Sequence, residues 1–308
     1  MIHSRTSSIL LFGLLLAALS VLAVGCGGGK GQNNGQSLAQ EYEAAKNETS
    51  VERRADRLIS VAAKQRQAND AGAAKRSLDE AFEACKKIKD PSQQATACVS
   101  LAQGYQLIEE PDAVRGALNI ARDATKKISQ QEDRALQWTS MARLQIRLDN
   151  QAMAQDHLNR VDELIDQIES PDGRLDVLVA VAELAHAMHK ASESDRFLKL
   201  ALDTATRFKG AGQRSQAQVK IAAAQARMDQ PTAAMVSFKQ AEAFAADVEK
   251  PVQKANLLID LALALAAVGE KKRAKEILAE AKSVAEKIAD VGYQNSALDR
   301  IYRSKKEI

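Results

Sequence analysis

The sequence predicts an all-α protein: a right-handed superhelical solenoid of six helix-turn-helix repeats, each 40 residues long, with a capping helix at each end. Apolar residues follow an i, i+3, i+4 pattern, which indicates amphipathic helices that face a core. Aromatic residues make up only 4% of the 308 residues, and Gly and Pro are sparse, as in helical proteins. The repeat itself is marked by alanines at a constant 40-residue step: Ala62, Ala102, Ala142, Ala182, Ala222 and Ala262.

Residues 1–25 have the form of a secretory signal peptide. A short polar start is followed by an apolar run, Ile9 to Val24, that is short for a membrane span. The run ends in Leu22-Ala23-Val24-Gly25-Cys26, which resembles the lipobox of bacterial lipoproteins, with Ala23 where leucine is more usual. The resemblance implies cleavage before Cys26 and acylation of its thiol. The alternative is an uncleaved N-terminal anchor with a buried Cys26.

Residues 26–36 are rich in Gly, Asn and Gln and cannot bury a core, so we expect a flexible tether. Acyl chains on Cys26 would hold the protein at a bilayer. Lipoproteins without an aspartate directly after the cysteine, as with Gly27 here, are commonly sorted to the outer membrane of two-membrane bacteria. The resemblance therefore implies a location at the periplasmic face of the outer membrane. Residues 37–308, which follow the tether, are expected to form the solenoid.

The elements of the solenoid follow in order. Residues 37–47 are expected to form a lone second helix, and repeat one places its two helices at about 52–67 and 71–88. Polar turns such as Asn69-Asp70 separate the helices within a repeat, and Asp90-Pro91 separates two repeats because proline stops or opens a helix. After repeat six we expect one more helix, because Leu298, Ile301 and Tyr302 repeat the first-helix pattern. A charged tail, Arg303 to Ile308, is expected to follow it.

Ala62, Ala74 and Ala81 show a small first-helix residue followed by alanines 12 and 19 positions later. This pattern resembles the tetratricopeptide repeat, and Trp138 occupies a position where that family often has tryptophan. Because the 40-residue period exceeds the usual length of about 34, the chain is tetratricopeptide-like. The resemblance implies a concave wall, lined by the first helices, that binds segments of a protein partner.

Mapping this pattern onto the chain gives the candidate partner-binding residues. An apolar, β-branched column could hold an extended or helical peptide, or it could be buried by tight superhelical curvature. This column consists of Ile59, Val99, Thr139, Val179, Val219 and Ile259. The polar candidates lie beside this column in the middle repeats: Gln103, Gln106, Arg143, Arg147, Glu183 and His186. Toward the C-terminal end the wall becomes apolar, with Leu263, Ala266 and Ala267.

Cys85 and Cys98 flank the turn near Pro91, on adjacent antiparallel helices. In an oxidising compartment, a disulfide closing this short loop could stabilise the fold by about 3 kcal/mol. The alternative is a pair of small core residues, because the equivalent positions in other repeats are apolar.

A basic column occupies the first turn of the first helices, where the helix macrodipole disfavours cations. It consists of Arg54, Arg134, Arg174, Arg214 and Lys254. We expect ion pairs within each repeat to Glu83, Glu163 and Asp203, which lie 29 residues after their arginines. A ligand-binding stripe is the alternative.

Neither catalysis nor a cofactor is indicated. The four histidines cannot be assembled with a nucleophile and an orienting group, and no Gly-rich phosphate loop follows a strand. His186 and His189 have a spacing that could place two ring nitrogens on one metal, but no third ligand is evident, so no metal is expected. The net charge of +3, with both signs interspersed, argues against nucleic acid as a partner.

The sequence thus favours a non-enzymatic, lipid-anchored envelope scaffold that binds a peptide segment or an envelope protein on its concave face. The alternative is a regulatory or sensory module for a small envelope ligand, although no small-molecule substrate is identified. An enzyme is the least favoured class.

Overall fold

The computed structural model describes residues 37–308, in which there are fourteen α-helices and no strand. Residues Leu38–Ile308 form one compact unit. The predicted all-α repeat architecture is confirmed, because the helices come in antiparallel pairs with one extra helix at each end. The signal peptide, Cys26 and the tether lie outside the described residues.

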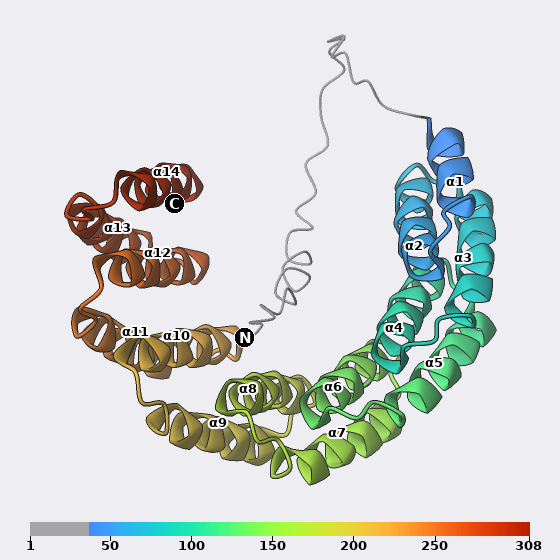
Figure 1. Cartoon of the computed structure of the whole chain (residues 1–308). Helices are drawn as coiled ribbons and strands as arrows, with labels where there is room; N and C mark the ends of the chain where they lie inside the picture. Colours follow the sequence, from blue (N-terminus) through green and yellow to red (C-terminus); the bar gives the residue numbers. More distant parts are fainter. Residues whose placement is uncertain (1–36) are drawn as a thin grey trace, which may run out of the picture. The chain divides into compact units, whose positions relative to one another are not determined.

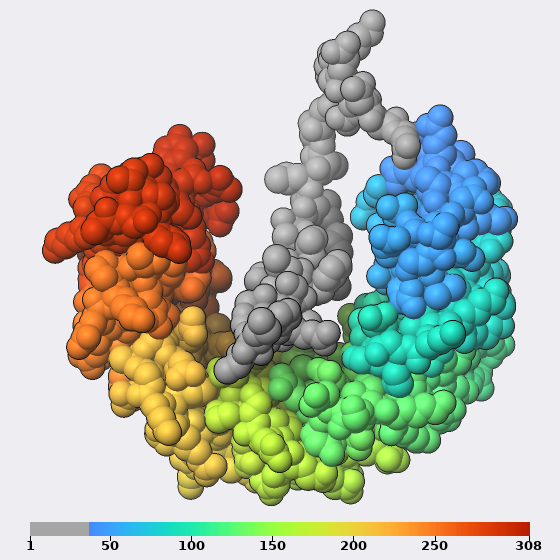
Figure 2. Space-filling view, viewed as in Figure 1, coloured from blue at the N-terminus to red at the C-terminus, as the bar shows by residue number. Residues whose placement is uncertain are grey.

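Within this unit the helices form two layers of a curved stack (Figure 1). The inner layer holds the first helices: α2 (Val51–Gln67), α4 (Pro91–Leu107), α6 (Gln131–Arg147), α8 (Pro171–Ala187), α10 (Ala211–Arg227) and α12 (Pro251–Ala267), followed by the extra helix α14 (Val291–Glu307). The outer layer holds α1 (Leu38–Lys46) and the second helices: α3 (Ala71–Cys85), α5 (Pro111–Thr125), α7 (Gln151–Ile165), α9 (Ala191–Thr206), α11 (Pro231–Ala246) and α13 (Lys271–Ala285). Consecutive repeats touch continuously along the stack (Figure 2).

The second helix of repeat one ends at Cys85, earlier than the predicted 88. The chain must reverse before Pro91 opens the next helix, so it leaves the helix after Cys85 while Ile88 stays buried in the connecting turn. The charged C-terminal residues remain helical as far as Glu307, where we expected a tail after the last helix.

Side chains at the helix starts explain why the helices begin where they do. Ser50, Asp90, Ser170 and Asp290 each precede a first helix, and each accepts a hydrogen bond from the backbone amide three residues later, at 2.8–3.3 Å. Asp70 does the same for α3 at 2.8 Å. These N-caps satisfy amide groups that the helix itself leaves without a partner.

The turn inside every repeat uses one residue in the left-handed region of backbone conformation. This residue ends the first helix and lets the second helix fold back against it. Gly269 has a φ of +90°, and the equivalent residues of the other repeats have φ between 55° and 60° despite carrying side chains: Asn69, Glu109, Asp149, His189 and Asp229.

The alanine column lies in the core. Ala62 is 3% exposed, and its five equivalents are fully buried. A small side chain there lets the two helices of a repeat approach closely, while larger side chains such as Leu58, Leu78 and Leu178 fill the space beside the crossing.

The expected ion pairs of the basic column are wrong: within residues 37–308, none of its members pairs with Glu83, Glu163 or Asp203. Four of its five members instead reach back to the end of the preceding outer helix, where the macrodipole favours a cation. The fifth, Arg214, lies over the ring of Phe244 in α11 of its own repeat, 4.9 Å from the ring centroid. Arg54 donates to the carbonyl of Glu48 (2.7 Å), Arg134 to that of Ile128 (2.8 Å) and Lys254 to that of Ala246 (2.8 Å), while Arg174 pairs with Asp166 (2.7 Å).

Candidate functional site

The predicted apolar column of the inner layer is largely used for packing. Val99 and Thr139 are 5% and 3% exposed, and the Thr139 hydroxyl donates to the carbonyl of Ala135 at 2.9 Å. Val179 and Val219 are half-buried. Ile259 is fully buried and Ile59 is half-buried. Because consecutive first helices pack directly on one another, this column offers a partner only the exposed parts of Ile59 and the two valines.

The predicted polar residues retain more of their surface. Gln103, Gln106 and His186 are half-buried, and the Gln106 side-chain amide donates to the carbonyl of Arg147 at 3.3 Å. Arg143 and Arg147 are exposed on α6, one helical turn apart. The accessible candidates therefore concentrate in repeats two to four.

Glu183 is the centre of a cluster that joins three inner helices. Its carboxylate accepts from Arg143 of α6 at 2.9 Å and from Nε of Arg227 of α10 at 2.7 Å. Glu183 is 18% exposed, whereas the two arginines are 48% and 58% exposed. We call Arg143, Arg147, Glu183 and Arg227 the cationic cluster.

The charges within the cationic cluster do not balance, because it holds three guanidinium groups and one carboxylate, and only Arg143 and Arg227 contact that carboxylate. Burial, followed by the nearby charge of Arg143, lowers the pKa of Arg147, but a guanidinium remains protonated in proteins. Two positive charges are thus left over on an accessible part of the inner layer. Such a surplus attracts acidic groups and forms strong hydrogen bonds with carboxylates.

Small apolar side chains continue the inner surface from the cationic cluster toward the C-terminal repeats. Ala223, Ala226, Leu263 and Ala266 are half-buried, and Ala267 is exposed. Arginine side chains therefore lie beside a low-relief apolar surface, which is a combination common in protein interfaces.

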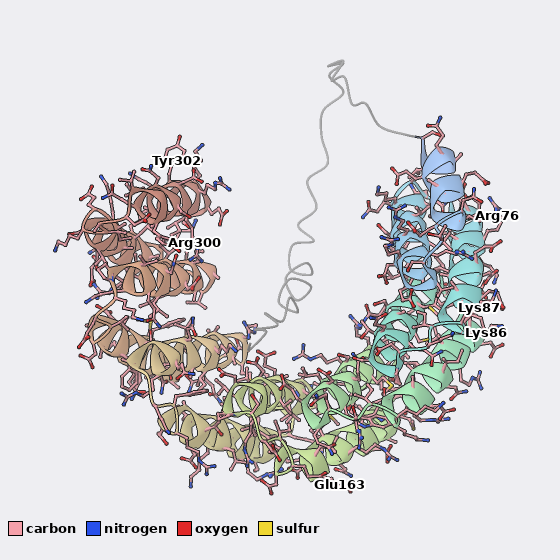
Figure 3. The ribbon with its side chains drawn as sticks, in the orientation of Figure 1. Arg76, Lys86, Lys87, Glu163, Arg300 and Tyr302 are labelled. Carbon is pink, nitrogen blue, oxygen red and sulfur yellow. The ribbon has the colours of Figure 1, made fainter. Side chains whose placement is uncertain are left out.

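Two other ion pairs join neighbouring inner helices one to one. Asp176 of α8 pairs with Lys220 of α10, and Asp260 of α12 pairs with Arg300 of α14. Figure 3 shows Arg300 between α12 and α14, where its guanidinium also donates to the Asn256 side chain at 3.0 Å. These pairs hold neighbouring repeats together and leave no surplus charge.

Arg227 is the member of the cationic cluster that the sequence analysis missed. It stands two repeats after Arg147 in the same column, with alanine at the equivalent positions in between and afterwards, Ala187 and Ala267. Arginine thus occurs twice in a column whose other members in the six repeats are uncharged, with Gln67 and Leu107 in the first two repeats, and this was a readable signal.

The two cysteines are free and buried in the structure, so it does not contain the predicted bridge. A hydrogen bond between the Cys85 and Cys98 thiols, together with burial, raises the pKa of Cys85. Disulfide formation between the two cysteines stays a prediction.

His186 lies in the last turn of α8, whereas His189 lies beyond the helix in the left-handed turn residue, with φ of 57°. The helical spacing assumed for two metal-binding rings is therefore not present. Across residues 37–308, no group of three His, Cys, Asp or Glu is arranged to hold a metal ion. None of the helices described there is long and apolar enough to cross a membrane.

No protein-family model matches the chain, and no curated protein matches it. Similar solved structures include Ton1535 from Thermococcus onnurineus NA1, with 16% identity, 86% of this chain and 94% of that chain covered, and a TM-score of 0.40. BtubC (BKLC) from P. vanneervenii has 14% identity, coverage of 69% and 92%, and a TM-score of 0.43. A Rap protein complexed with Competence and Sporulation Factor has 14% identity, coverage of 87% and 79%, and a TM-score of 0.39.

Proposed function

We propose that this protein is a lipid-anchored scaffold of a bacterial envelope, tethered through Cys26, that binds a protein partner on the inner layer of its helical stack. Binding rather than catalysis is its activity. The cationic cluster supports the proposal, because two arginines share the carboxylate of Glu183 and Arg147 adds a third guanidinium on the same helix as Arg143, which leaves two surplus positive charges on an accessible wall.

The charge and the apolar surface of the inner layer indicate which side chains a partner segment should carry. Acidic side chains would pair with Arg147 and Arg227, and small apolar side chains would lie over Ala226, Leu263 and Ala267. An extended or helical segment that carries both kinds of residue matches this surface.

The test is capture of envelope proteins by the full chain from detergent-solubilised membranes. The double variant Arg147→Glu, Arg227→Glu reverses the charge of the wall and should lose the captured protein. A matched control, Arg76→Glu with Lys87→Glu, makes the same charge change on the outer side of the stack, where Figure 3 shows both residues, and should retain it. Circular dichroism establishes that both variants are folded; equal capture by both would refute the proposal.

A further inference from the structure

A cavity of about 460 Å³ lies between the outer helices α5 and α7, with α6 as its floor. This volume is within the range of cavities that hold small molecules, about 300–1,000 Å³. The lining residues come from α5, α6, α7 and the turn between the last two, so the cavity is separate from the inner-layer cationic cluster.

The repeat register shows what is unusual about this place. In repeats one and five, a buried glutamine of the first helix pairs with a serine 12 residues later: Ser77 donates to Gln65 at 2.7 Å, and Ser237 donates to Gln225 at 2.8 Å. Repeat three has Gln145 and His157 at the same positions, and both line the cavity. The imidazole ring of His157 thus replaces the serine hydroxyl, and the Gln145 and His157 side chains are not hydrogen-bonded to each other.

Two buried polar atoms of the lining residues have no hydrogen-bond partner. Nδ1 of His157 is one, although the side chain is only 2% exposed, and Nε of Arg122 is the other. The His157 ring packs on the indole of Trp138, with 5.1 Å between ring centroids. A buried polar group without a partner is costly, and natural structures retain few of them.

The lining combines positive charge with apolar surface. Arg115 and Arg122 line the cavity, and none of its described lining residues is acidic. Most of the remaining wall is apolar: Pro111, Val114, Leu118, Met141, Leu148 and Met153.

Two of the three acidic residues nearest this site form ion pairs with its lining arginines, and the third pairs with Arg160. Asp112 pairs with Arg115 at 2.6 Å, and Asp123 pairs with Lys126 at 3.3 Å while lying 3.6 Å from Nε of Arg122. Asp156 pairs with Arg160 at 2.9 Å and lies 3.7 Å from Nδ1 of His157, too far for a hydrogen bond.

We propose that this cavity binds a small monocarboxylate with an apolar body, such as a short fatty acid or an aromatic acid. The carboxylate accepts hydrogen bonds from Nε of Arg122 and from the protonated Nδ1 of His157, which satisfies both unpartnered atoms. The apolar body lies against Leu118, Met141 and Met153. Binding selects the neutral histidine tautomer that carries its proton on Nδ1.

The protein carries its own reporter of binding, because Trp138 is its only tryptophan and its ring contacts His157. The full chain is titrated with octanoate and benzoate, and in parallel with the uncharged octanamide and benzamide. Tryptophan emission is recorded together with methionine methyl resonances, to which Met141 and Met153 contribute. We expect a saturable change with the carboxylates and binding at least about tenfold weaker for the amides.

Two variants test the contacts. Arg122→Gln removes the cationic donor, and His157→Ser installs the residue that repeats one and five already accommodate. Each should weaken carboxylate binding about tenfold or more, whereas Arg76→Gln, the same change on the exposed outer face of α3, should leave it unchanged.

The possible results separate cleanly. If neither Trp138 emission nor the methionine resonances change saturably with any probe, the cavity is not a site for this ligand class. If the amides bind as tightly as the acids, or if Arg122→Gln binds normally, the carboxylate assignment is overturned.

Discussion

His157 should make the stability of this protein sensitive to mild acid. Burial lowers the pKa of His157 to about 4, with the charges of Arg160 and Arg122 adding to the effect and Asp156 opposing it. In the unfolded chain the same imidazole has its ordinary pKa of about 6.5. Above pH 6.5 the ring is neutral in both states and contributes nothing to the pH dependence.

As the pH falls from about 6.5 to about 4, only the unfolded chain binds the proton, so the folded state loses stability. Below about pH 4 both states are protonated, and the loss stays constant. Lowering the pKa from about 6.5 to about 4, at about 1.4 kcal/mol for each tenfold change in proton affinity, gives a loss of about 3–4 kcal/mol. The side chain is 2% exposed, so solvent screening does not reduce this figure substantially.

The assay compares urea unfolding of the parent protein and His157→Ser between pH 7 and pH 4, followed by circular dichroism. Because the carboxylates are common to both proteins, the difference between the two pH profiles isolates the histidine. NMR titration of the imidazole signals measures its pKa directly. Parallel profiles, or a His157 titration centred near pH 6.5, would refute the reasoning.

Four further outcomes are expected. Glu109→Asn should raise the free energy of unfolding by about 0.5–1 kcal/mol, since asparagine tolerates the left-handed backbone better; chemical denaturation would show no gain if the turn relaxes. Ala182→Leu should lower that free energy by about 1–3 kcal/mol in the same assay, because the site is fully buried, and an unchanged value would contradict the tight helix crossing. Glu183→Gln should cost about 1 kcal/mol at low salt and less at high salt, since its partners are half exposed. Cys26→Ser should abolish the acyl mass and the membrane association of the expressed protein; retention of either would exclude the lipid anchor.

The repeat architecture could be predicted because its causes are local. The alanine column, the apolar stripes and the polar turn residues each recur at the same step, and a residue's place on a helix face follows from sequence spacing alone. The caps at Ser50 and Asp90 and the turn at Gly269 need only neighbouring residues, so helix starts and turns were also readable. The end of the second helix was predicted at residue 88, although the helix ends at Cys85. Ile88 is buried in the connecting turn, so it follows the apolar pattern of the helix without belonging to it.

The candidate site was predicted only in part. The repeat pattern was enough to place Arg143, Arg147 and Glu183 on first helices, but the ion pair between Glu183 and Arg227 depends on how far α10 lies from α8. Val99 became buried while Val179 stayed half-buried, although both occupy the same column. Exposure of that column depends on the packing between repeats, which spacing within one repeat does not specify.

The sequence by itself determined the helices, their pairing and the face that each buries, because helix periodicity and turn chemistry act over a few residues. The tertiary structure alone decided which neighbours the polar side chains meet. Three members of the basic column bind carbonyls at the end of the preceding outer helix, and His157 borders a cavity where its equivalents in repeats one and five have hydrogen-bond partners. Both outcomes depend on the angle and distance between helices that are far apart in the chain, and those are set by how all the side chains between them pack.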